Sequence, residues 1–185
     1  MSEWNFKEAI NKFKNRKRYS VLNPTVLASI PDEDLVQAIL DHILDVKVGN
    51  RLADMPRILE RLSTGFRIIE ATLRVENEVR NGGFNQFFHN GGTSCINDAI
   101  EGFRLIGAPK TAVLTENALS VYKEEIPFHN AVKNDGSLEA FSESYEHTRL
   151  NDLDSQFYGL YEAVEPLAAL RIQYIRTHPN EFISE

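Results

Sequence analysis

Apolar side chains recur at helical spacing along most of this chain, and this periodicity limits what it can fold into. One such run follows Pro31 and stops at Gly49, and its apolar residues are Leu35, Ile39, Ile43 and Val46. No segment alternates apolar and polar residues as a half-buried strand does. The pattern therefore predicts an all-α protein.

Glycine, proline and capping residues divide the chain into further helices. We expect one from Pro56 to Asn81-Gly82-Gly83, with a possible kink at Gly65. A second begins at Ser94 as N-cap and closes at Gly107. The rest of the pattern predicts a helix from Pro109 to before Pro127, a loop over 128–137, and helices over 138–148, 151–164 and 166–177. Together they predict a single compact domain over 1–185, a bundle of about seven to nine helices.

Length and composition narrow the class of protein. A chain of 185 residues can bury a core without metal or disulfide staples, and its single cysteine, Cys95, cannot form an internal disulfide. The first residues lack the apolar run of a signal peptide, and no apolar stretch is long enough to cross a bilayer. A cytoplasmic protein without membrane contact is the expectation.

Charge is distributed unevenly around a net value of −7. Residues 1–20 hold six basic and two acidic side chains, which gives +4, so the remaining residues carry −11. Residues 139–165 contain seven acids and only Arg149, a net −6. We expect 1–20 to form a basic helix or arm that is largely solvated and partly docked through Trp4, Phe6 and Phe13. An acidic protein is not expected to bind nucleic acid directly.

Residues that could carry catalysis are scattered. The five histidines form no metal-binding pair, and Glu143 with His147 is read as a solvated helical pair. No nucleophile elbow, P-loop or dinucleotide fingerprint is present. We therefore predict a protein that is not an enzyme and has no metal or cofactor. A distant alternative is an enzyme site near His89, Asn90 and Cys95.

The most distinctive segment runs from Glu78 to Asn90. Two glycines allow a sharp reversal where a helix ends, and three phenylalanines then share one helical face. Polar side chains in the segment could satisfy backbone groups freed at the reversal. The residues concerned, expected to be mainly structural, are Asn81, Gly82, Gly83, Phe84, Gln86, Phe87, Phe88 and Asn90.

This N-G-G-F-x-Q-F-F-x-N segment resembles the hallmark of a bacterial family of domains of unknown function that includes a DNA-mimic protein. The resemblance extends over 60–178 and includes the runs Ala99–Ala108, Leu153–Tyr158 and Tyr174-Ile175. It implies an all-α fold. For the DNA-mimic member it implies a dimer whose acidic surface occupies the DNA-binding site of a transcription factor.

Mimicry of DNA requires acids gathered on one face, because a charge of −11 spread over the whole globule is too dilute to stand in for phosphates. The predicted acidic surface comprises Glu139, Glu143, Glu146, Asp152, Asp154, Glu162 and Glu165, with Glu116, Glu124 and Glu125 as possible neighbours. Its expected partner is a basic DNA-binding protein, and a homodimer would double the array. The main alternative is a regulatory interaction module that uses a hydrophobic surface.

Overall fold

A computed structural model describes residues 6–183, apart from the side chains of Phe6, Lys7, Ala9 and Glu162. This part of the chain contains eleven α-helices, nine of them at least seven residues long, and no strand, which confirms the predicted fold class. The helices are α1 (Phe6–Lys14), α2 (Pro24–Ser29), α3 (Asp32–His42), α4 (Met55–Leu59), α5 (Thr64–His89), α6 (Ile96–Leu105), α7 (Pro109–Glu124), α8 (Ile126–Asp135), α9 (Leu138–His147), α10 (Asn151–Ala163) and α11 (Leu167–Thr177). Short π or 3₁₀ segments are η1 (Ile43–Val48), η2 (Leu52–Asp54), η3 (Gly92–Ser94) and η4 (Pro179–Phe182).

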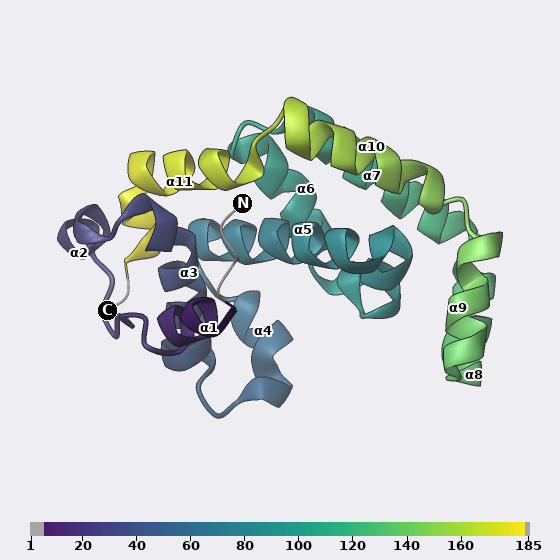
Figure 1. The fold of residues 1–185 in the computed structure, drawn as a ribbon, viewed down its shortest axis with the longest axis horizontal. Helices are drawn as coiled ribbons and strands as arrows, with labels where there is room; N and C mark the ends of the chain where they lie inside the picture. The colour runs from purple at the N-terminus through teal and green to yellow at the C-terminus, as the bar shows by residue number, and fades with distance from the viewer. Residues whose placement is uncertain (1–5, 184–185) are drawn as a thin grey trace.

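Helix α5 runs through the middle of the molecule, and the other helices are arranged around it (Figure 1). Helices α1 to α4 and α11 gather at one end of the long axis, whereas α6, α7 and α10 lie toward the other. Helix α6 packs against both α5 and α7, and α10 also contacts both. The pair α8 and α9 forms a hairpin at the far end of the long axis, so this hairpin is the most outlying part of the fold.

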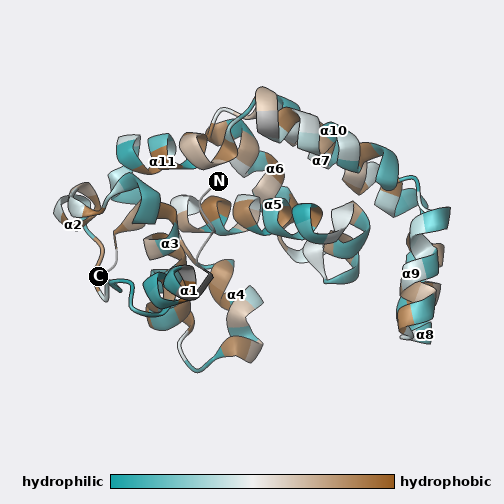
Figure 2. Cartoon of the chain, viewed as in Figure 1, coloured by the Kyte–Doolittle hydropathy of each residue, from teal (hydrophilic) through white to brown (hydrophobic). Residues whose placement is uncertain are grey.

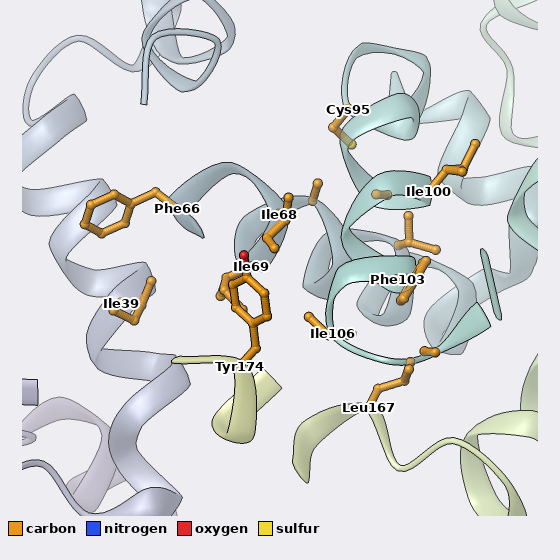
Figure 3. Packing of buried hydrophobic residues seen from close by; sticks show 14 of the residues in the cluster. Ile39, Phe66, Ile68, Ile69, Cys95, Ile100, Phe103, Ile106, Leu167 and Tyr174 are labelled. Atoms are coloured by element: carbon orange, nitrogen blue, oxygen red, sulfur yellow. The ribbon is translucent and has the colours of Figure 1, made fainter. Parts of the chain in front are cut away.

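The core is one hydrophobic cluster that extends from Leu22 to Phe182. Its centre is formed by α5 and α6, where Ile68 faces Ile100 and Phe103 (Figure 3). Gly102 permits this approach, because a Cβ there would lie 2.8 Å from Thr72 Cγ2 and overlap α5. Hydrophobic residues also colour α3 and α4 strongly in Figure 2. The apolar periodicity of the sequence thus corresponds to real buried faces.

The C-terminal helix closes the end of the core that α2 and α3 form. The Arg176 guanidinium donates to the carbonyl oxygens of Leu27 (2.5 Å) and Ile30 (2.6 Å) and pairs with Asp32 at 2.6 Å. The last carbonyls of a helix lack the usual i+4 donors, and Arg176 supplies donors to two carbonyls at the end of α2. Phe182 then packs edge-on against Phe66 with a ring-centroid distance of 5.5 Å.

Three predicted boundaries are wrong. The segment predicted as a loop over 128–137 is mostly α8, because Pro127 starts a helix well and Gly136, at φ 70°, ends it. The single helix predicted from Pro56 is broken after Leu59 and restarts at Thr64, so Gly65 lies in a first turn, not mid-helix. Ser94 is not the N-cap of α6, since its hydroxyl donates to Gly91 within the preceding 3₁₀ turn.

Within the described residues, the basic segment is attached through two arginines and Tyr19, which packs against the core. Phe13 is 55% exposed, and Trp4 lies outside the described residues. Arg16 donates through Nε and Nη2 to the two carboxylate oxygens of Asp41, each at 2.6 Å, and Arg18 pairs with Asp45 at 2.5 Å. The expected docking through Phe13 is therefore wrong, and two of the basic charges are neutralised within the fold.

Candidate protein-interaction surface

Helix α9 displays three glutamates on one exposed stripe. Its N-terminus is fixed by Ser137, whose hydroxyl accepts a hydrogen bond from the Ala140 N–H at 3.1 Å. Glu139, Glu143 and Glu146 follow at i, i+4 and i+7, which places them within about 60° of one another around the helix axis. All three are exposed. We call these three side chains the acidic stripe.

The opposite face of α9 attaches the helix to the kinked end of α5. Ser144 is buried and its Oγ accepts a hydrogen bond from Asn85 Nδ2 at 2.7 Å. The Tyr145 hydroxyl donates to the Gly82 carbonyl at 2.7 Å, and the Phe141 ring lies 4.4 Å from that of His89. Because these contacts hold one side of α9 inward, the acidic stripe points away from α5.

No ion pair within residues 6–183 neutralises the acidic stripe. The acids considered as its neighbours differ in this respect. Glu124 and Glu125 both pair with Arg149, at 2.7 and 3.0 Å, and Glu116 pairs with Arg104. The paired arginines partly neutralise these three carboxylates, so they are not counted as part of the acidic stripe.

The remaining predicted acids divide into exposed and internal ones. Asp152 is exposed in the first turn of α10, whereas the Glu162 side chain lies outside the described residues. Glu165 is only 5% exposed and caps α7, accepting bonds from the N–H groups of Lys110 (2.9 Å) and Thr111 (2.8 Å) and from the Thr111 hydroxyl (2.6 Å). The prediction that Glu165 belongs to a partner-binding surface is wrong, because both of its carboxylate oxygens accept hydrogen bonds from the N-terminus of α7.

Asp154 is also used inside the fold. Its Oδ1 accepts a hydrogen bond from the Phe84 N–H at 2.9 Å. Burial raises the pKa of this carboxyl to about 6, although the Phe84 hydrogen bond opposes the shift. Asp154 therefore stabilises the kink of α5 and is a poor substitute for a phosphate, which is fully charged at neutral pH.

The glycine pair produces a kink that other helices hold in place. Gly82 (φ −160°, ψ 30°) and Gly83 (φ 72°, ψ 179°) leave the helical region inside α5. Carbonyls freed there accept from tyrosines of α9 and α10: Gly82 from Tyr145, and Val79 from Tyr158 at 2.9 Å. The motif was expected to satisfy these groups with its own amides, and that expectation is wrong.

The other motif residues differ in their surroundings. Phe84, Phe87 and Phe88 are buried with no exposed surface. Gln86 and Asn90 each donate to Glu78 Oε2 at 2.9 Å, so they join the two arms of the kink. Asn81 is exposed beside it.

The residues of the alternative enzyme hypothesis do not line one common cavity. The His89 ring packs on Phe141, whereas Cys95 is 6% exposed and lines a cavity beside α5 with Arg67 and Glu70. Burial raises the pKa of the Cys95 thiol to about 12, so it is not a thiolate at neutral pH. Among the described residues no group of three or more His, Cys, Asp or Glu side chains could hold a metal ion.

The fold and this surface define a class: an all-α protein that presents unpaired carboxylates on an outlying helix. The chain belongs to the DMP19-like protein family, whose family model matches residues 60–178, more than half of the sequence. This is a family of DNA mimics and is generally non-enzymatic. The match covers the segments over which the resemblance extends. No curated protein matches the chain. No solved structure matches it either. No helix within residues 6–183 is long and apolar enough to cross a membrane.

Proposed function

We propose that this protein is a non-enzymatic, cytoplasmic interaction module that occupies the DNA-binding surface of a basic partner protein. The observation that supports it most directly is the acidic stripe: three exposed carboxylates on α9 with no neutralising cation in the described part of the chain. Family membership points to the same kind of activity.

The spacing of the stripe suits this role. Seven residues of α-helix separate Glu139 from Glu146, about 10 Å along the axis. One strand of DNA carries a phosphate every 3.4 Å or so, hence about three phosphates over that length. The stripe therefore matches the linear charge density of one strand over a short distance. Asp152 is a further exposed acid, in the first turn of α10, and a homodimer would double the number of exposed carboxylates.

Association of this kind depends on ionic strength, because it replaces small ions around both charged surfaces. A DNA-binding protein that faces the stripe presents the lysines and arginines that otherwise contact phosphates. Duplex DNA should then compete with this protein for one and the same surface. Direct binding of this chain to DNA is not part of the proposal, since its net charge of −7 opposes it.

The experiment begins with proteins of the native cell that bind to a duplex-DNA column. This fraction is passed over the immobilised protein at rising salt, with and without duplex DNA as competitor. We expect retention of a basic protein that both salt and DNA abolish. The combined Glu139→Lys, Glu143→Lys and Glu146→Lys variant should lose that retention.

A matched control reverses three acids that are exposed elsewhere, Glu33, Asp54 and Glu101, and so changes net charge equally. Circular dichroism and thermal melting establish that both variants stay folded. Equal loss with the two variants would show that only net charge matters, and unchanged retention with the α9 variant would refute the assignment of the stripe.

A second candidate function uses apolar surface instead. Leu52 is 67% exposed and Leu44 is 41% exposed, both beside α4. A partner bound there would stay bound at high salt, because apolar burial is not screened. Persistence of a retained protein at high salt, independent of the α9 charges, would favour this reading.

A further inference from the structure

A cleft lies along one side of α5, far from the acidic stripe on α9. It consists of two adjoining cavities of about 340 and 270 Å³ that share Met55, Glu70 and Arg74 as lining residues. Helix α5 lines both cavities, and η1, η2 and α4 supply apolar residues from the other side. The larger cavity has the volume of a small-ligand site.

The walls of the cleft are mostly apolar. Leu52, Met55 and Leu59 line the larger cavity, while Leu40, Leu44 and Leu73 line the smaller one. Figure 2 shows the hydrophobic character of α4, which carries Met55 and Leu59. Exposed leucines beside a cavity are stabilised when an apolar group covers them. One part of a ligand for this cleft should therefore be apolar.

Glu70 lies where the two cavities meet. It has neither a hydrogen bond nor an ion pair within residues 6–183, although its side chain is only partly exposed. Burial raises the pKa of its carboxyl, and Arg74, one turn further along α5, offsets only part of that effect. The Arg74 guanidinium instead donates to the Asn90 carbonyl at 3.2 Å. A half-buried carboxylate without a donor is costly, so a cationic donor would be bound favourably there.

The charges around the cleft favour a cation. Its acidic lining residues are Glu60, Glu70, Glu78 and Asp98, and its basic ones are Arg67 and Arg74, which gives −4 + 2 = −2. Arg67 is already paired, its Nε 3.4 Å from Asp98 Oδ1. Glu78 accepts hydrogen bonds from Gln86 and Asn90, so the acids without a direct partner among the described residues are Glu60, which is exposed, and Glu70, which lines both cavities.

We propose that this cleft is a binding site for a small amphipathic amine. Its ammonium group donates hydrogen bonds to the Glu70 carboxylate, and its apolar body packs against Met55, Leu52 and Leu59. This site is independent of the proposed DNA mimicry, since it uses none of the α9 residues.

The probe is 2-phenylethylamine, with 2-phenylethanol as a neutral molecule of nearly the same shape. Binding is followed at neutral pH by calorimetry and by amide NMR shifts, for which Cys95 and Met55 report from the cleft itself. We expect the amine to bind at least about tenfold more tightly than the alcohol, as charge-assisted hydrogen bonds do. The amide shifts should map to α4, α5 and the start of α6.

Glu70→Gln keeps the shape of the side chain and removes its charge, so it should reduce amine affinity about tenfold or more and leave the alcohol unaffected. Glu101→Gln, an exposed acid of α6 outside the cleft, removes the same charge and should change neither. Equal affinities for amine and alcohol, an equal effect of the two variants, or shifts centred elsewhere would each overturn the proposal.

Discussion

Single residues in this protein decide whether a carboxylate serves the fold or the surface. Glu165 and Glu146 are both acids near the C-terminal part of the chain, yet one caps α7 and the other faces solvent. Asp154 is an intermediate case, because it holds the Phe84 N–H while burial raises the pKa of its carboxyl to about 6. Its role can be tested through the pH dependence of stability.

Asp154→Asn keeps an oxygen that can accept from Phe84 and removes the titration. The folded-state pKa lies above the ordinary value of 3.8, so the native protein binds the proton more tightly than the unfolded chain does. The contribution of Asp154 to stability is therefore full below that ordinary value and is lost as pH rises through about 6. We expect the variant to be more stable than wild type at neutral pH by about 1–2 kcal/mol, allowing for partial solvent exposure.

Urea unfolding at several pH values measures this difference directly. Wild type and variant should converge as pH falls toward 4 and diverge through the range up to about 6. A pH-independent difference would mean that the Asp154 carboxyl is not perturbed.

Gly83 provides a test at the kink itself. Its φ of 72° with ψ of 179° suits glycine alone, and a Cβ there would overlap the Asp154 carboxylate. Gly83→Ala should cost about 3 kcal/mol or more in unfolding free energy. Gly91 also has a positive φ, but a Cβ there would meet no atom within 4 Å, so Gly91→Ala should cost only about 1 kcal/mol. Similar losses for both would count against the role of Asp154 packing.

Helix α9 has one face packed against α5 and an opposite face on which three negative charges repel one another. Glu139, Glu143 and Glu146 stand at i, i+4 and i+7, and like charges at such spacing destabilise a helix. None of them is offset by a cation in the described structure. A helix that keeps such an arrangement loses a little stability, as binding surfaces often do.

Replacing Glu143 with Gln removes the central charge and should stabilise the protein by about 0.5 kcal/mol. The same change should weaken binding of a basic partner. Glu33, exposed in the first turn of α3, is a matched control with the opposite sign, because a negative charge near a helix N-terminus is favourable. Chemical denaturation measures the unfolding free energies of both variants. A loss of stability on Glu143→Gln would contradict the repulsion.

At the scale of the whole molecule, side chains far apart in sequence connect the central helix to the C-terminal one. Arg171 is 1% exposed, and its Nη1 donates to Glu76 Oε2 at 2.6 Å while its Nε donates to Thr72 at 3.0 Å. Its Nη2 has no hydrogen-bond partner among the described residues. The Glu76–Arg171 pair therefore links α11 to α5, although one guanidinium nitrogen is left without a hydrogen bond.

Glu76→Ala should destabilise the protein by about 3–5 kcal/mol, because it leaves the Arg171 charge buried and unpaired. The double variant Glu76→Leu with Arg171→Met removes both charges and should recover most of that loss. Denaturant unfolding of the two variants and wild type tests this. A double variant that is no more stable than Glu76→Ala would show that the two side chains act separately.

The sequence by itself determined the helices, because periodicity and glycine or proline boundaries are local properties of the chain. It placed Phe84, Phe87 and Phe88 on one helical face, and the structure buries that face. The i, i+4 and i+7 spacing of Glu139, Glu143 and Glu146 is likewise a property of the sequence alone. It misplaced the loop at 128–137, where a proline that starts a helix resembled one that ends it.

Only the tertiary structure decided which acids remain free and where a cleft opens. Glu165 meets the N-terminus of α7 from 54 residues away, and Asp154 meets Phe84 across 70. Glu70 lies between two cavities whose other walls come from α3, η1, η2, α4 and the start of α6 with the turn before it. Such pairings depend on how the helices pack. A residue's own neighbours in sequence carry no signal of them, since burial and hydrogen bonding are set by groups that only folding brings near.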